Sequence, residues 1–233
     1  MNRLLVSDAA AACVTILAVG KHLAHTGIRS LAMKILLTGF DPFGIDTVNP
    51  ALEAVKLVSG NVAGAQIIKQ VVPTAFGKSI DVVYNAMKEH KPDAVLCIGQ
   101  AGGRFALTPE KVAINFIDAR INDNEGCQPF DAQVFEDGPD AYFSSLPIKA
   151  MVNEIQACGI PAQISYSAGT FVCNSLMYGV LYHIAHELPS MRGGFMHVPF
   201  IPEQVLMRPS TPSMALSDIT SGIEAAIKAI VEN

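Results

Sequence analysis

Hydrophobic runs and amphipathic stretches alternate along the chain from residue 33 to its end. Short apolar runs predict strands, and apolar residues recurring every three or four positions predict helices. The expected strands cover residues 34–38, 65–72, 94–98, 111–117, 161–166 and 194–198, and the expected helices cover residues 50–58, 78–89, 147–157, 175–187 and 216–231. Apolar strands separated by helices are typical of a mainly parallel sheet with both faces covered. The pattern therefore predicts a single α/β domain.

Residues 1–32 do not share this alternation. Arg3 precedes the apolar run Ala9–Val19, which is the order of charge and apolar centre found in a secretory signal. Asp8 interrupts that pattern, and the run is too short to span a bilayer as a helix. A mitochondrial presequence and a translation start at Met33 are the other interpretations. We treat residues 1–32 as an N-terminal extension outside the fold, and residues 33–233 as the domain.

Composition and charge narrow the class of protein. Half of the 233 residues are hydrophobic, 16% are charged and the net charge is −5, which is typical of a globular chain. The chain has no cluster of Lys and Arg that could follow a phosphate backbone, which argues against a nucleic-acid partner. Its five cysteines are odd in number and lack CxxC spacing, which argues against a disulfide framework or a structural zinc site. We expect a cytoplasmic protein with no metal and no membrane partner.

Cys173 is the first candidate for chemistry, because it follows the turn residue Gly169 and precedes a predicted helix. The helix dipole and free N–H groups at such a place can lower a cysteine pKa from about 8.5 to roughly 3.5–7.5. The same N–H groups can receive an oxyanion. His197, in a short strand-like run, is the candidate base. An inert core cysteine and a core histidine bonded to a backbone carbonyl are the alternative interpretation.

A third group must orient the base in such a site. Glu110 opens a predicted strand after a glycine-rich loop, and Asp118, Asp123 and Glu125 are rival carboxylates. The residues alone leave this choice open. Arg120 can pair with a carboxylate or help to stabilise an oxyanion.

Two glycine-containing loops follow predicted strands, where ligands bind in open α/β sheets. The loop 99–104 lacks both the GxGxxG spacing and the Lys-Ser/Thr of a phosphate loop, so its glycines favour close approach to a small substrate. The loop 39–44 carries Phe40 and Phe43. These rings suit the wall of a pocket for a flat, uncharged ligand, and burial in the core is the other interpretation.

Several segments, in this order along the chain, resemble the pyroglutamyl peptidase I family, also called the pyrrolidone-carboxylate peptidases. The segments are Thr38–Gly44 with Asn49 and Pro50, Gly99–Arg104, Pro109–Asn115, Asp123–Gly126, Ser167–Asn174 and Gly193–Pro199. The resemblance covers essentially all of residues 33–233, and residues 1–32 lie outside it.

The resemblance implies a single three-layer α/β/α domain that cleaves after the N-terminal pyroglutamyl residue of peptides, without a metal or organic cofactor. By motif position, Cys173 would be the nucleophile that forms a thioester, His197 the base and Glu110 the orienting carboxylate. Phe40 and Phe43 would form the walls of the lactam pocket, with Asn49 and Gln100 as polar partners. Because bacterial members of this family commonly assemble as tetramers, the resemblance also implies a homo-oligomer, either a tetramer or a dimer.

Three other classes of function fit parts of the pattern. A non-catalytic binding protein could keep the scaffold, although it would not need Cys173, His197 and Glu110 together. A nucleoside phosphorylase-like enzyme would need a cationic phosphate site, for which Arg104 and Arg120 are the candidates near the mouth. A serine hydrolase is disfavoured because Ser167 and Ser175 lack the G-x-S-x-G elbow.

Overall fold

A computed structural model of the chain describes residues 32–233. The expected N-terminal extension, apart from residue 32, lies outside these described residues. Within residues 32–233, every helix is too short or too polar to cross a membrane.

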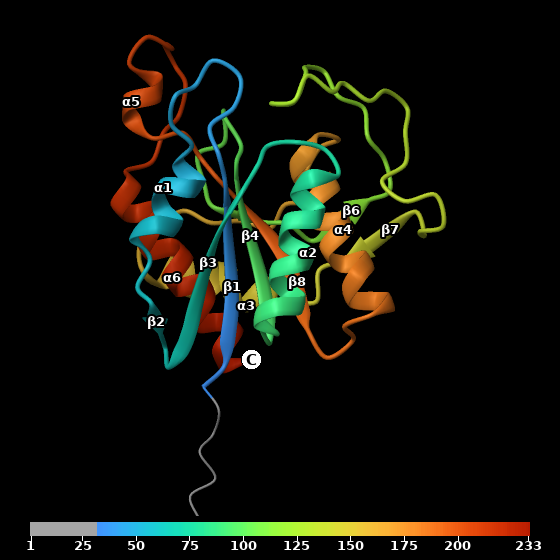
Figure 1. The fold of residues 1–233 in the computed structure, drawn as a ribbon. Coiled ribbons are helices and arrows are strands. Elements are labelled where there is room, and N and C mark those ends of the chain that lie inside the picture. Colours follow the sequence, from blue (N-terminus) through green and yellow to red (C-terminus); the bar gives the residue numbers. More distant parts are fainter. Residues whose placement is uncertain (1–31) are drawn as a thin grey trace, which may run out of the picture. The chain divides into compact units, whose positions relative to one another are not determined.

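A six-stranded sheet forms the centre of the described domain (Figure 1). Four parallel strands make up its body, in the spatial order β3 (Ala65–Val72), β1 (Lys34–Phe40), β4 (Ala94–Gln100) and β8 (Arg192–Val198). The antiparallel strands β2 (Asn61–Val62) and β5 (Thr108–Pro109) form its edges. The prediction of a mainly parallel, mixed sheet is confirmed.

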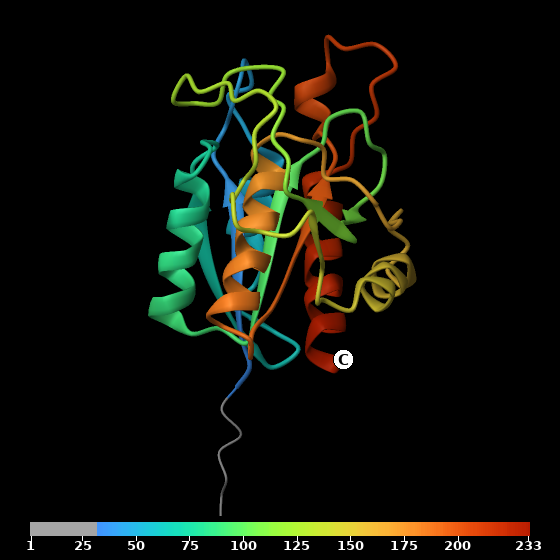
Figure 2. The same ribbon diagram turned by 90° about the vertical axis from the view of Figure 1, so that its right-hand side faces the viewer.

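Helices cover both faces of this sheet, which gives the domain three layers (Figure 2). The helices are α1 (Pro50–Leu57), α3 (Ile148–Ala157) and α6 (Leu216–Glu232) on one face, and α2 (Lys78–His90) and α4 (Val172–His186) on the other. Successive strand residues point to opposite faces. Ile35 and Leu37 accordingly pack with the first set of helices, and Leu36 packs with the second. The single α/β/α domain expected from the sequence is confirmed.

The segment 161–166, expected to be a strand, was wrongly predicted. It runs parallel beside residues 107–111 but forms only isolated bridges, between Leu107 and Ala162 and between Glu110 and Ser165. Between those bridges stands Pro109, which has no N–H to donate, so the ladder is interrupted.

Other short elements also differ from the pattern. The expected strand 111–117 is reduced to β6 (Val112–Ile114), which pairs with β7 (Ala141–Phe143) in a separate two-stranded sheet. β2, β5, β7 and the four-residue helix α5 (Pro202–Val205) were not predicted. Elements of two to four residues contain too few positions to show a hydrophobic period.

The parallel strands β1, β4 and β8 end at the same edge of the sheet (Figure 1). The segments that follow them, together with the start of α4, therefore meet there. This is the edge at which open α/β sheets bind ligands.

Candidate active site

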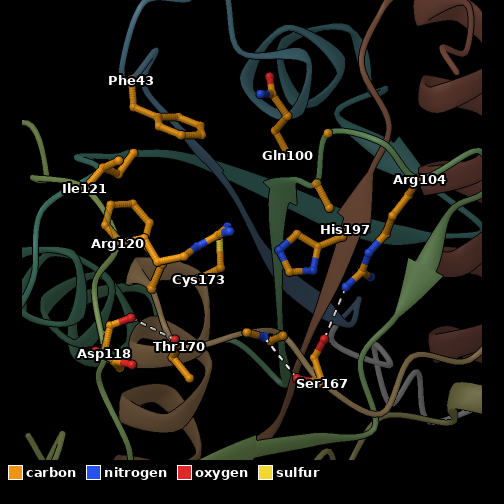
Figure 3. Close-up of a pocket in the computed structure, with 15 residues that line it drawn as sticks. Phe43, Gln100, Arg104, Asp118, Arg120, Ile121, Ser167, Thr170, Cys173 and His197 are labelled. Atoms are coloured by element: carbon orange, nitrogen blue, oxygen red, sulfur yellow. Dashed lines mark hydrogen bonds between the residues drawn. The ribbon is translucent and has the colours of Figure 1, made fainter. Parts of the chain in front are cut away.

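A cavity of about 820 Å³ opens at the carboxyl edge of the parallel strands (Figure 3). Its lining brings together the candidate nucleophile, the candidate base and the glycine-rich loop. The lining residues are Phe43, Gln100, Ala101, Gly102, Arg104, Asp118, Arg120, Ile121, Ser167, Ala168, Gly169, Thr170, Phe171, Cys173 and His197. Cys173 and His197 are 24 positions apart in the sequence but face the same space.

Cys173 is the second residue of α4, where the backbone N–H groups have no carbonyl one turn earlier to bond. The next residue, Asn174, fixes this helix start: its Oδ1 accepts from the Ile114 N–H at 3.0 Å, and its Nδ2 donates to the Ile114 carbonyl at 2.9 Å. On the sheet side, Gly99 provides the space for the thiol. A Cβ at residue 99 would lie 3.0 Å from the Cys173 sulfur and 2.6 Å from the Phe195 ring.

The low pKa expected for Cys173 was wrong. Cys173 keeps some contact with the cavity, yet the protein packed around its sulfur raises the pKa to about 12. The nearby negative charge of Glu110 adds to this effect, and the positive charge of Arg104 opposes it. The resting group is therefore a thiol, because burial outweighs the helix terminus.

His197 hydrogen-bonds to Glu110 in the interior beside the cavity. Its Nδ1 lies 2.7 Å from Oε1 of Glu110, and both side chains are almost wholly buried. An ionised carboxylate can only accept a hydrogen bond, so Nδ1 carries the proton and Nε2 is left as the free base. Burial lowers the pKa of His197 below its usual value, while the hydrogen bond with Glu110 opposes that shift.

Arg104 binds the same oxygen of the Glu110 carboxylate as His197 does. Its Nη1 donates to Oε1 of Glu110 at 2.7 Å and to the Thr108 hydroxyl at 2.5 Å. Its Nη2 donates to the Ser167 carbonyl at 3.1 Å, on the segment that leads to Cys173. The guanidinium therefore links the carboxylate, β5 and the loop before α4.

Burial alone would raise the pKa of Glu110, but its partners reverse the shift and lower it. The hydrogen bond with His197 contributes most to this lowering, and the hydrogen bond with Arg104 adds to it. Oε2 of Glu110 has no hydrogen-bond partner among residues 32–233, since the Ser165 hydroxyl donates to the Ser167 carbonyl in this structure. Glu110 therefore stays ionised, because it accepts hydrogen bonds from His197 and from the positively charged Arg104.

The rival carboxylates have other partners. Asp123 accepts hydrogen bonds from the backbone N–H groups of Phe76, Glu125 and Cys127, so it organises a loop. Glu125 pairs with Lys78 at the surface. Asp118 lines the cavity but makes no hydrogen bond to His197, whereas Glu110 bonds to His197 directly.

Only some of the residues expected to bind the lactam line the cavity. Phe43 and Gln100 line the cavity, as does Arg120, whose side chain extends into it (Figure 3). Phe40 is the last residue of β1 and is buried in the core against Phe195, with ring centroids 6.3 Å apart. Asn49 caps α1 by accepting from the Ala51 N–H and donates to the Asp41 carbonyl, so it holds the loop that carries Phe43.

Sequence reasoning missed two residues of the site. Phe171 lines the cavity beside Phe43, at a distance of 6.4 Å between ring centroids. Its place two residues before Cys173 was the available signal. Arg104 was considered only as a phosphate ligand, and its bonds to Glu110 commit it to the carboxylate instead.

An imidazole oriented by a buried carboxylate, a cysteine in the same cavity and free N–H groups at a helix start define a hydrolase of the cysteine type. Within residues 32–233, no group of three or more His, Cys, Asp or Glu side chains is arranged to hold a metal ion.

The comparisons with known proteins give the family. Residues 33–233 match the family described as pyroglutamyl peptidase, so the chain belongs to that family, as the resemblance predicted. A pyrrolidone-carboxylate peptidase of Clostridium botulinum is 58% identical over 201 residues, covering 86% of this chain and 94% of that protein. One from Streptococcus suis is 58% identical over 200 residues, covering 86% and 93%.

Solved structures agree with this assignment. The pyroglutamyl peptidase I of Bacillus amyloliquefaciens is 50% identical, with a TM-score of 0.85 over 87% of this chain and 97% of that one. A mutant pyrrolidone carboxyl peptidase of Pyrococcus furiosus is 40% identical, with a TM-score of 0.83 over 86% and 99%. The protein is therefore a peptidase, and the predicted enzyme class is confirmed.

Proposed function

We propose that the chain removes the N-terminal pyroglutamyl residue of peptides by a thioester mechanism on Cys173. The observation that carries this proposal is the 2.7 Å bond between His197 and the buried Glu110 at the cavity that Cys173 also lines. No cofactor is needed, because the three side chains supply nucleophile, base and orienting charge.

In the first step, Nε2 of His197 takes the proton of the Cys173 thiol as the sulfur attacks the main-chain carbonyl of the pyroglutamyl residue. The new S–C bond gives a tetrahedral oxyanion, which the N–H groups at the start of α4 stabilise with help from Arg120. Because thiol and imidazole are both neutral at rest, the charges develop only during this attack. Glu110 stabilises the imidazolium that forms.

In the second step, the imidazolium gives its proton to the leaving amine as the C–N bond breaks, which releases the rest of the peptide and leaves a thioester. Water then attacks the thioester, His197 takes a proton from it, and the C–S bond breaks. Free pyroglutamate leaves and Cys173 regains its proton.

Specificity follows from the charge of the substrate. A pyroglutamyl ring has no ammonium group, so it can enter the space beside Phe43, Phe171 and Gln100 without losing a hydrated charge. An ordinary N-terminus would have to bury its ammonium group unpaired, which costs several kcal/mol. We further propose cytoplasmic peptides as substrates and a homo-oligomer, tetramer or dimer, as the working form.

The direct test is release of a chromogenic amine from its pyroglutamyl amide, with the matching prolyl amide as a control substrate. We expect turnover of the pyroglutamyl amide alone, independent of added phosphate, and its loss in Cys173→Ala. Cys127→Ala is the matched control variant, because Cys127 is an exposed thiol away from the cavity. A folded, reduced wild type that leaves the pyroglutamyl amide intact would favour a binding protein instead.

A further inference from the structure

We propose that Gln204 sets the direction in which the Gln100 side-chain amide faces, so that the cavity is offered an N–H donor and not a carbonyl acceptor. Gln204 lies outside the cavity, on the short helix α5, and is a positioning residue that acts through Gln100. The inference deepens the proposed function, on which it rests, by naming which atom of the lactam the pocket recognises.

The amide of Gln204 has one orientation because its two ends meet backbone groups of opposite polarity. The two ends of a side-chain amide are told apart by their hydrogen-bond partners. Oε1 of Gln204 accepts from the Ile201 N–H at 3.1 Å, and a backbone N–H can only donate. Nε2 donates to the Val48 carbonyl at 3.3 Å, and a carbonyl can only accept. Turning the amide over would leave both contacts mismatched.

This orientation dictates that of Gln100. The same Nε2 of Gln204 donates to Oε1 of Gln100 at 3.0 Å, so the carbonyl end of the Gln100 amide faces away toward α5. Its NH₂ group then remains for the cavity, and Figure 3 shows the Gln100 nitrogen on the side of Phe43. Strand pairing with Val198 fixes the backbone of Gln100 in β4. The contact with Gln204 therefore controls only the side-chain torsions of Gln100.

The chemistry of the ring fits this polarity. A pyroglutamyl lactam presents a carbonyl oxygen that accepts hydrogen bonds, and its proline counterpart lacks that oxygen. A donor fixed before the ligand arrives loses little rotamer freedom on binding. If the Gln100 amide were reversed, its oxygen would face the oxygen of the lactam carbonyl, and the lactam carbonyl would have no hydrogen-bond donor.

The test uses the full chain with two substitutions at residue 204. Gln204→Glu keeps the acceptor for Ile201 but cannot donate, so Gln100 turns its NH₂ group toward it. Gln204→Met removes the hydrogen bond to Gln100 altogether. Binding of 2-pyrrolidinone and of 2-pyrrolidinethione, whose sulfur is a poor acceptor, is measured by calorimetry, alongside kinetics with a pyroglutamyl amide. Glu203→Gln, an exposed change on the same helix, is the control.

We expect wild type and Glu203→Gln to prefer the lactam over the thiolactam, and Gln204→Glu to lose that preference. Gln204→Glu should weaken lactam binding and raise KM by about tenfold, the size of one hydrogen bond, with kcat nearly unchanged. Gln204→Met should show a smaller change in the same direction. In a Gln100→Met background, Gln204→Glu should add nothing, because its effect passes through Gln100.

A purely structural role for Gln204 would weaken both probes equally and would lower kcat. That result, additive effects of the two substitutions, or a wild type that does not distinguish the probes would overturn the inference. Failure of the proposed function is separate, because it is read from wild-type turnover of the pyroglutamyl amide, whereas probe binding does not depend on catalysis.

Discussion

Nδ1 of His197 lies 2.7 Å from Oε1 of Glu110, although 87 positions separate the two residues in the chain. Backbone pairing brings them together: Thr108 and Pro109 pair antiparallel with His197 and Met196 of β8, and the Glu110 N–H donates to the Phe195 carbonyl at 2.8 Å. The carboxylate is therefore held by the edge of the sheet and not by a flexible loop. Such support keeps an active-site group within the narrow range of productive geometry.

Replacing Glu110 by Gln tests whether its charge matters beyond its position. The amide oxygen can still accept from Nδ1, but nothing then balances the imidazolium, so we expect kcat/KM to fall by roughly 10²–10⁴-fold. Because Glu110 opposes the lowering of the His197 pKa, the acid limb of the pH–rate profile should also move to lower pH. Steady-state kinetics across pH measure both effects. Activity within a few-fold of wild type would rule out the orienting role.

The pH dependence of kcat/KM in the wild-type enzyme gives a second prediction, for its acid limb. The base must be neutral to accept the thiol proton, and the pKa of His197 lies below its usual value of 6.5 because the ring is buried. We therefore expect kcat/KM to hold as pH falls to 6.5 and to decline only below that value. A midpoint above pH 7 would mean that the imidazolium is favoured at rest.

The protonation state of Cys173 is open to direct measurement. With a pKa of about 12, the thiol should react slowly with iodoacetamide at pH 7, and its rate should keep rising with pH without a plateau in the neutral range. Mass spectrometry of each cysteine-containing peptide separates this reaction from that of the exposed Cys127 and Cys158. A plateau for Cys173 below pH 7 would show a resting thiolate instead, as the helix terminus alone predicts.

The fold followed from the sequence where long elements carried the pattern. Apolar runs such as 34–38 and 94–98 are buried on both faces, so their composition identifies central strands. The segment 161–166 alternates between apolar and polar residues, which is also typical of a strand, yet the missing N–H of Pro109 on the neighbouring segment prevents a continuous ladder. That defect depends on which segments become neighbours, which the local pattern does not contain.

The site was predictable to a similar extent. Cys173 and His197 could be selected because each lies beside a turn or a strand end, whereas the residues alone left four carboxylates for the third role. The choice of Glu110 came from the family resemblance, and the β5–β8 register explains its position. Phe40 and Phe43 are both phenylalanines of the segment 39–44, so residue type does not tell them apart. Phe40 is still within β1 and faces the core, while Phe43 lies beyond the end of the strand and lines the cavity.

Replacing Arg104 tests how far the carboxylate depends on its second partner. Arg104→Met should lower kcat by about ten- to a hundredfold, because Glu110 would lose a charged hydrogen bond in a buried place. Arg104→Lys keeps the charge but not the two-armed contact with Glu110 and the Ser167 carbonyl, so it should restore part of the loss. Lys228→Met, at an exposed surface pair, is the matched control. Full activity of Arg104→Met would show that His197 alone keeps Glu110 in place.

Gly99 tests the packing around the thiol. A methyl group at residue 99 would meet the Phe195 ring at 2.6 Å and the Cys173 sulfur at 3.0 Å, so Gly99→Ala should displace both. We expect a loss of stability of about 1–3 kcal/mol together with a large loss of kcat. Gly60→Ala is the control, since a Cβ there meets no atom within 4 Å. Thermal unfolding and kinetics of the two variants should differ clearly, and equal behaviour would contradict the packing argument.

Deletion of residues 1–32 tests the domain boundary. The match to the pyroglutamyl peptidase family begins at residue 33, and β1 begins at Lys34, so the shortened chain retains every element of the described domain. We expect it to fold, with a melting temperature and kcat/KM close to those of the full chain. The matched contrast is deletion of residues 1–37, which also removes Ile35, Leu36 and Leu37. All three are fully buried in the central strand, and each contributes about 1.5–3 kcal/mol by burial. This second deletion should therefore abolish folding, and circular dichroism would show it. If removal of residues 1–32 already made the protein insoluble or inactive, those residues would belong to the folded domain.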